Sequence, residues 1–156
     1  MPSFQEDFAE SKGAPIIYNG MELIGMDRVP VEKKFSGTLK LISTNSEYKQ
    51  AVCLRVNKGK MKVGEGELEK GKIFVIWEEY LKDGLITFEG VTKDLELLVY
   101  NAWEQILWTG QPFTARWMNG AAMIVEVNGN TRLYKCNDGH PDDNFDDIIF
   151  EVTINE

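Results

Sequence analysis

Histidine and cysteine are scarce in this chain of 156 residues, and the scarcity excludes several kinds of chemistry. His140 is the only histidine, and Cys136 is the cysteine nearest to it. A Cys-x-x-x-His pair without further cysteine or histidine ligands does not make a zinc site. Cys53 and Cys136 both lie in apolar surroundings, so two buried thiols and a single disulfide are the alternatives, and their spacing does not decide between them.

Positive charge and long apolar runs are also lacking. The 17 Lys and Arg residues are outnumbered by 25 Asp and Glu, which gives a net charge of -8. Nucleic acids and anionic membranes attract basic surfaces, so we expect neither as a partner. No stretch approaches the roughly 20 apolar residues that span a bilayer, and residues 1–20 lack the features of a signal peptide. We expect a soluble protein, either cytoplasmic or exported without a conventional leader.

Two enzyme signatures are incomplete. Gly64-Glu65-Gly66 lacks the third glycine and the following helix of a nucleotide-binding loop. A glycoside hydrolase needs two carboxyl groups at a defined separation, and Glu78, Glu79 and Glu104 are the acids considered for it. Acids on strands more often form a solvated face. We expect a protein that is not an enzyme.

The composition does support a folded β domain. Apolar residues make up 43% of the chain, including four Trp, eight Phe and five Tyr, which is enough for a sizeable core. Short runs rich in Val, Ile, Phe, Tyr and Trp alternate with clusters of Gly, Asn, Asp and Lys. We predict a single all-β domain over residues 1–156, an antiparallel β-sandwich of about nine to eleven strands.

Local patterns place several elements. Residues 1–20 read as an N-terminal extension with a short helix, in which Phe4 and Phe8 lie one turn apart and dock on the body. The strands predicted before residue 110 are 37–43, 50–57, 72–78 and 94–103. The segments 50–57 and 72–78 are mostly apolar, as expected of strands covered on both faces.

The clearest hairpin lies near the C-terminus. Asn128-Gly129 separates the apolar-rich runs 122–127 and 130–134, and this dipeptide favours a type I′ turn. A last strand is predicted over Ile148–Ile154, paired with this hairpin.

An acidic segment, residues 137–147, precedes that last strand. Five carboxylates fall between Asp138 and Asp147, without a Lys or Arg among them. Their repulsion is relieved by a hard cation, because Ca²⁺ takes about six to eight oxygen ligands and prefers carboxylates and carbonyls. An EF-hand is excluded, since Asp147 and Thr153 stand where its loop needs Gly and Glu. The predicted metal ligands are Asp138, Asp142, Asn144, Asp146 and Asp147.

The segment resembles the calcium loop of the soluble two-calcium bacterial lectins that bind fucose and mannose. The resemblance rests on Asn137-Asp138-Gly139, on the run Asp142-Asp143-Asn144-Phe145-Asp146-Asp147 and on the strand that follows, and it covers about residues 131–156. This sequence departs from the family by exchanging Asn and Asp at 144 and 146, by one extra residue around Pro141, and by Asn137 in place of Glu.

The resemblance implies a lectin in which two vicinal sugar hydroxyls coordinate Ca²⁺ and bond to neighbouring side chains. It assigns Asn137 and Asp143 to the sugar, and Glu156 as the terminal carboxylate that completes the site of a neighbouring subunit in a homo-oligomer. Aromatic residues offer a second sugar platform. Of the four tryptophans, Trp108 and Trp117 are the surface candidates, because a loop at 109–112 separates them.

Two alternatives to the lectin remain. The acidic segment can be a solvated turn, with Asp138-Gly139 and Pro141-Asp142 as turn formers. The protein can also be a structural or protein-interaction β-sandwich with a structural calcium ion or none. Sugar binding that disappears with a chelator would favour the lectin, whereas unchanged self-association in chelator would favour the interaction protein.

Overall fold

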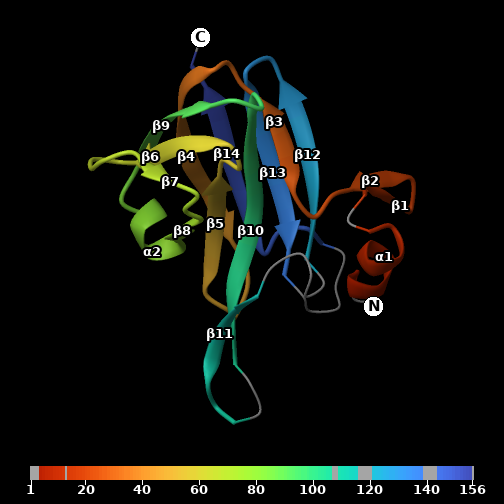
Figure 1. Ribbon diagram of the computed structural model, residues 1–156. Helices are drawn as coiled ribbons and strands as arrows, with labels where there is room; N and C mark the ends of the chain where they lie inside the picture. Colours follow the sequence, from red (N-terminus) through yellow and green to blue (C-terminus); the bar gives the residue numbers. More distant parts are fainter. Residues whose placement is uncertain (1–3, 13, 107–108, 116–120, 139–143, 156) are drawn as a thin grey trace.

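The computed structural model describes residues 4–12, 14–106, 109–115, 121–138 and 144–155 (Figure 1). Over these residues the chain is an all-β sandwich, as predicted, with two short helices, α1 (Gln5–Glu10) and α2 (Glu78–Leu81). The strands before residue 80 are β1 (Ile16–Tyr18), β2 (Met21–Leu23), β3 (Asp27–Pro30), β4 (Lys34–Thr44), β5 (Gln50–Arg55), β6 (Gly59–Val63), β7 (Glu69–Lys70) and β8 (Phe74–Trp77). The later strands are β9 (Ile86–Thr92), β10 (Glu96–Ile106), β11 (Pro112–Ala115), β12 (Ala122–Asn128), β13 (Thr131–Asn137) and β14 (Ile148–Ile154).

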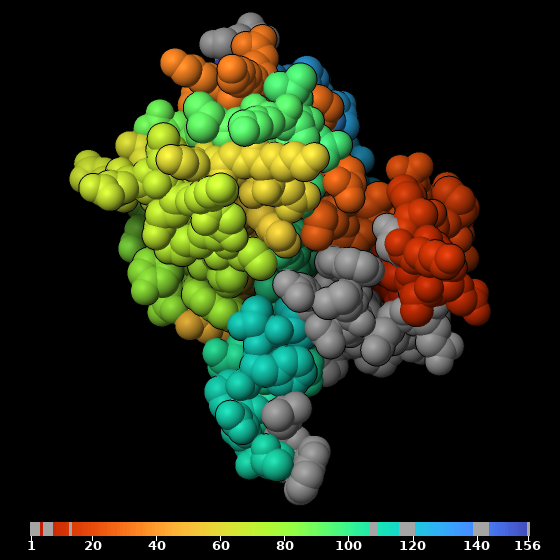
Figure 2. Space-filling model, viewed as in Figure 1, coloured from red at the N-terminus to blue at the C-terminus, as the bar shows by residue number. Residues whose placement is uncertain are grey.

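Two antiparallel sheets form the layers of the sandwich. One has seven strands in the order β12-β13-β14-β4-β9-β6-β7, and the other has the order β11-β10-β5-β8, with β3 also paired to β10. The small β1–β2 sheet stands apart with α1 beside it, and β11 projects beyond the body (Figures 1 and 2). The described part of the chain has 14 strands rather than about nine to eleven, because β1, β2, β3, β7 and β11 are each only two to four residues long.

Buried and exposed side chains alternate along the strands, and the buried ones form the core between the two sheets. On β4, Phe35 and Leu39 are buried and Lys34 and Lys40 are exposed, as the period of a half-buried strand requires. On the central strand β5 all residues from Gln50 to Leu54 are buried, which confirms the prediction for that segment. The prediction for 72–78 was wrong in part: β8 is an edge strand, and its Val75 is 37% exposed.

The C-terminal hairpin forms as predicted, but its turn is shifted by one residue. Asn128 pairs with Thr131, so the two turn residues are Gly129 and Asn130. Gly129 has a φ of 64° and Asn130 is not in the left-handed region, which fits a type II′ turn with glycine first rather than a type I′ turn over Asn128-Gly129. The last strand β14 pairs with β13 as expected and continues the sheet to β4.

The N-terminal helix docks on the body through Phe8 and through Phe4, which directly precedes the helix. Phe4 and Phe8 are both buried, in a small apolar cluster with Leu23, Ala122 and Phe145. The ring of Phe4 lies 6.0 Å from that of Phe145, measured between centroids. The helix therefore packs directly on the acidic segment, and the predicted docking is confirmed.

A buried polar contact joins the two sheets near the turn of the C-terminal hairpin. Tyr134 on β13 donates its hydroxyl to Asp27 on β3 at 2.6 Å, and Arg132 forms an ion pair with the same carboxylate at 2.9 Å. The ring of Tyr134 is stacked on Phe150, with 4.8 Å between the centroids. Asp27 is only 8% exposed. A buried carboxylate needs hydrogen-bonding or charged partners, and the ion pair and the hydrogen bond supply them.

Cys53 and Cys136 are both buried and are not joined in a disulfide, so the disulfide alternative is wrong. Within the described ranges, no helix has the length and apolar character needed to cross a membrane.

Candidate functional site

The base of the acidic segment is closed by the β13–β14 ladder. Cys136 pairs with Ile148, and the Asp147 N–H donates to the Cys136 carbonyl at 3.0 Å, one step beyond the last strand pair. Asp138 follows β13 directly, and its own N–H donates to the Asp147 carboxylate at 2.9 Å. The first and last acids of the segment therefore lie side by side.

Asp138 and Asp147 are both buried, at 2% and 4% exposure. Asp138 accepts hydrogen bonds from the Ser46 hydroxyl at 2.7 Å and from the Gln50 amide at 3.4 Å. Two neighbouring carboxylates in a buried position repel each other, and hydrogen-bond donors such as Ser46 and Gln50 reduce that repulsion. Carboxylate oxygens are the kind of ligand that a hard cation such as Ca²⁺ takes.

The other described residues of the segment have different surroundings. Asp146 is half-buried and Asn144 is exposed. Asn137 is fully buried, and its side-chain oxygen accepts the Phe145 N–H at 2.8 Å, which fixes the returning chain. Phe145 takes a left-handed backbone conformation, with a φ of 55°, that turns its ring into the cluster with Phe4.

The segment between β4 and β5 forms the opposite wall of the site, and the sequence reasoning missed it. Thr44 pairs with Ile148, and the Asn45 N–H donates to the Asp147 carbonyl at 3.0 Å. The Asn45 side chain donates to Asp146 at 2.9 Å. The polar run after β4 was a signal for a loop, but about 100 residues separate it from the acids and nothing local links the two.

Two buried amides hold the start of the acidic segment from the other sheet. Gln50 on β5 donates to Asp138, as described, and to the Tyr48 carbonyl at 3.1 Å, while Asn101 on β10 donates to the Asn137 carbonyl at 3.0 Å. Both residues have 0% exposure, and within the described ranges their side-chain oxygens have no hydrogen-bond partner. Buried polar atoms are rarely left unpaired, so these two oxygens are exceptions that stand close to the start of the acidic segment.

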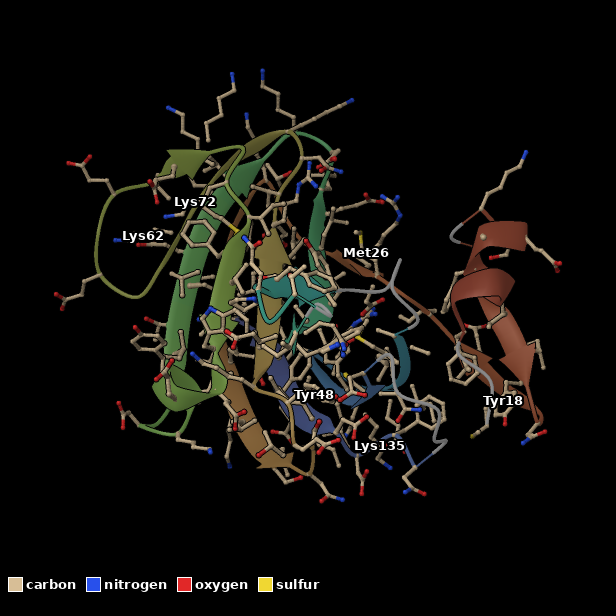
Figure 3. All side chains as sticks on the ribbon, turned by 90° about the horizontal axis from the view of Figure 1, so that it is seen from below. Tyr18, Met26, Tyr48, Lys62, Lys72 and Lys135 are labelled. Carbon is tan, nitrogen blue, oxygen red and sulfur yellow. The ribbon has the colours of Figure 1, made fainter. Side chains whose placement is uncertain are left out.

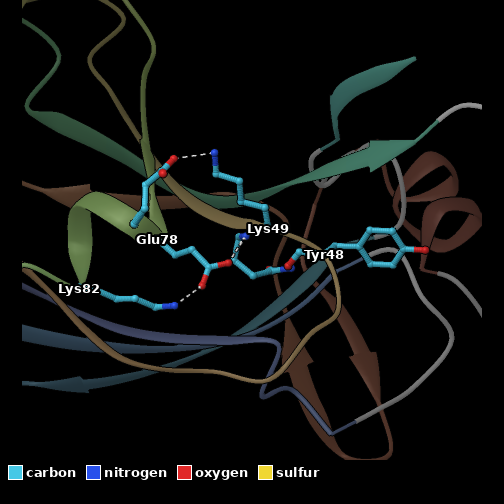
Figure 4. A network of polar contacts seen from close by, with 6 residues as sticks. Tyr48, Lys49, Glu78 and Lys82 are labelled. Carbon is cyan, nitrogen blue, oxygen red and sulfur yellow. Dashed lines mark hydrogen bonds and ion pairs between the residues drawn. The ribbon is translucent and has the colours of Figure 1, made fainter. Parts of the chain in front are cut away.

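A polar network fixes the β4–β5 segment from behind (Figure 4). Glu78 accepts the Gln50 N–H at 2.9 Å and pairs with Lys82 at 3.0 Å. Burial favours a higher pKa for Glu78, but the hydrogen bond from Gln50 and the Lys82 ammonium outweigh it, and the pKa lies below its usual value. Glu79 pairs with Lys49, whose ammonium lies 4.9 Å from the Trp77 ring centroid.

Between the two walls is an open depression of about 480 Å³. Its lining is polar except for one aromatic ring and consists of Thr44, Asn45, Ser46, Glu47, Tyr48, Asp138 and Asp147. Figure 3 shows Tyr48 near this end of the sandwich, viewed from below. The depression presents hydroxyl, amide and carboxylate groups and one aromatic side chain to solvent.

The described residues do not by themselves form a metal centre. In this part of the chain, no three Asp, Glu, His or Cys side chains converge as metal ligands would. The predicted ligand Asp142 and the predicted sugar-binding residues Asp143, Glu156, Trp108 and Trp117 lie outside the described residues. Among the other tryptophans, Trp103 is buried beside Ala115 and Ala121, as expected for core packing.

In comparisons with protein-family models, curated proteins and solved structures, nothing matches the chain.

Proposed function

We propose that this protein is a non-enzymatic, calcium-dependent carbohydrate-binding module whose site is the depression between residues 44–48 and the acidic segment. The observation that carries the proposal is the burial of Asp138 and Asp147 side by side at its wall. Ca²⁺ binds carboxylate, amide and backbone oxygens together, so a site does not require three carboxylates.

Amide side chains that bond to the start of the acidic segment would add oxygen ligands to the two acids. The orphaned oxygens of Gln50 and Asn101 belong to residues bonded to the start of the segment, and amide oxygens are hard ligands. On the open side, Ca²⁺ would take hydroxyl oxygens of a sugar in place of water. Asn45, Glu47 and Tyr48 line that side and would bond to or stack on the same sugar. Asp142 and Asp143 remain predicted contributors to the cation and the sugar.

A second candidate is a protein-interaction domain in which the acids only fix the loop. The observation in its favour is that Ser46 and Gln50 already donate to Asp138, and the Asp138 N–H to Asp147. These bonds partly compensate the two charges without an ion.

Thermal unfolding with Ca²⁺, Mg²⁺ or EDTA distinguishes the two candidates. A ligand that binds only the folded state adds about 2.7 kcal/mol at a hundredfold excess over its dissociation constant. We expect a clear rise of the midpoint with Ca²⁺, and loss of that rise in Asp147→Asn, which keeps the shape of the side chain. The matched control is Asp83→Asn, an exposed acid in the turn after α2.

A glycan array with and without chelator then tests the sugar. Calcium-dependent glycan binding that Asp147→Asn abolishes and Asp83→Asn preserves supports the lectin. Absence of any calcium effect on unfolding contradicts the metal site, and the interaction domain then becomes the better proposal.

A further inference from the structure

A cluster of lysines occupies the end of the seven-stranded sheet farthest from the acidic segment. Its members are all exposed and are Lys33, Lys34, Lys58, Lys60, Lys70 and Lys93, which we call the lysine pole. The strand β4 runs from Lys34 to Thr44, so the pole and the acidic site are about 33 Å apart at 3.3 Å per residue. A protein with a net charge of -8 therefore gathers six of its 17 basic residues at one end.

Strand register aligns three of these lysines across the outer face of the sheet. Lys34 on β4 pairs with Val91 on β9, Val91 pairs with Lys60 on β6, and Lys60 pairs with Lys70 on β7. Directly paired residues of antiparallel strands point to the same side, and this is the solvent side, because Met61 beside Lys60 is fully buried. Backbone hydrogen bonds hold the other three lysines beside this row. The Thr92 N–H donates to the Lys33 carbonyl, and the Lys93 N–H donates to the Lys58 carbonyl, each at 2.8 Å.

The ammonium groups of the pole are not neutralised by ion pairs. None of the six lysines is in a salt bridge within the described part of the chain, whereas neighbouring Lys62 and Lys72 pair with Glu89 and Glu69. Among the described residues, the other acids next to the six lysines are the exposed Glu32 and the half-buried Asp94, which accepts the Thr92 hydroxyl at 2.6 Å. Figure 3 shows several nitrogen-tipped side chains projecting together at the top of the view, beside the olive ribbons of β6 and β7.

Protection of the sheet edge does not account for this arrangement. Lysines on an edge strand discourage pairing with another chain, and Lys70 on β7 serves that purpose. Lys34 lies on β4, three strands in from that edge, where it cannot block edge pairing. Lys60 and Lys70 stand directly opposite each other, an arrangement that destabilises a sheet unless an anion lies between them.

We propose that the lysine pole is a docking surface for an acidic, extended segment of a protein partner. The row spans three strand spacings, about 14 Å, which a short extended peptide covers with carboxylates about 6.6 Å apart on one side. Half-buried Val91 in the middle of the row offers an apolar contact to the side chains between those acids. A duplex or membrane presents a broader negative surface, which would also meet Glu32, Glu69 and Glu89 around the row.

Fluorescence anisotropy with a labelled peptide of alternating Glu and Val, about 12 residues long, tests the surface. We expect saturable binding that weakens with salt, and about tenfold weaker binding for the triple variant Lys34→Gln, Lys60→Gln, Lys70→Gln. The matched control is Lys12→Gln, Lys40→Gln, Lys135→Gln, which removes the same charge elsewhere, with Lys40 on the same strand and face as Lys34. The control should bind within about twofold of the wild type.

Three results would overturn the proposal. The first is no binding by the wild-type protein, and the second is equal weakening by both triple variants, which would show only general charge attraction. The third is tighter binding of a heparin fragment or a single-stranded oligonucleotide than of the peptide in the same buffer. Adding EDTA should leave peptide binding unchanged, so this test stands independently of the calcium site.

Discussion

Tyr134 and Asp27 show how single residues hold the two sheets in register. The phenol donates to a carboxylate that is almost fully buried, and Arg132 neutralises the charge of that carboxylate. This contact does not stand out in the sequence, since Arg132 and Tyr134 lie 105 and 107 positions away from Asp27. The partner of Tyr134 depends on how β3 pairs with β10 in the folded sandwich.

Tyr134→Phe should destabilise the protein although it preserves the packing on Phe150. Hydrogen bonds to charged groups contribute about 1.5–3 kcal/mol, so we expect a loss in that range in urea unfolding. Tyr80→Phe is the control, because Tyr80 is 61% exposed and its change should be below about 0.5 kcal/mol. A loss for Tyr134→Phe no larger than the control would show that Arg132 alone satisfies Asp27.

For the secondary-structure elements, patterns among neighbouring residues predicted the C-terminal strands, whereas contacts between residues distant in the sequence could not be predicted. The hairpin over residues 122–137 and the strand at 148–154 followed from turn chemistry and alternation, both of which act between neighbours. The turn lies one residue later than predicted, because Gly129 takes the first turn position. The contacts of residues 44–50 with the acidic segment could not be predicted, because two strands of different sheets had to be placed first.

Phe145 links the acidic segment to the N-terminal helix, so the two elements should loosen together. Phe145→Ala removes a ring that is 3% exposed and packs near Phe4, and comparable core substitutions cost about 3–5 kcal/mol. We expect faster limited proteolysis near residue 12 and a weaker calcium-induced rise of the unfolding midpoint. Ile17→Ala, at a position 72% exposed on the same N-terminal unit, should change neither. Unchanged proteolysis in Phe145→Ala would show that α1 is held independently of the segment.

Across the whole molecule, charge is divided between two ends of the sandwich. The acids Asp138 and Asp147 lie at one end of β4 and β14, and the lysine pole lies at the other. The net charge of -8 correctly describes the chain as acidic, but it hides this division, because only the strand register places distant lysines in one row. Composition therefore predicted the sandwich but not the lysine pole.

The free energy of unfolding should decrease at alkaline pH, because the buried Cys136 thiol and the buried Tyr134 phenol stay protonated in the folded state. Burial raises the pKa of the Cys136 thiol, with a contribution from nearby Asp147, and burial together with Asp27 raises the pKa of Tyr134. In the unfolded chain the thiol and the phenol have their ordinary pKa values of about 8.5 and 10. Above those pH values the unfolded state therefore holds fewer protons than the folded state. The free energy of unfolding is then fully present below about pH 8.5 and decreases as pH rises, by up to about 1.4 kcal/mol per pH unit for each group.

Urea unfolding between about pH 7 and 11, with a reducing agent present, measures this decrease. Cys136→Ala should remove the contribution that begins near pH 8.5 and leave the one that begins near pH 10, which Tyr134→Phe should remove in turn. The slope against pH is the quantity compared, because both variants also lower the absolute stability. A wild-type curve that stays flat to about pH 11 would mean that local opening lets water reach both groups, and that the interior around β13 is less closed than its burial indicates.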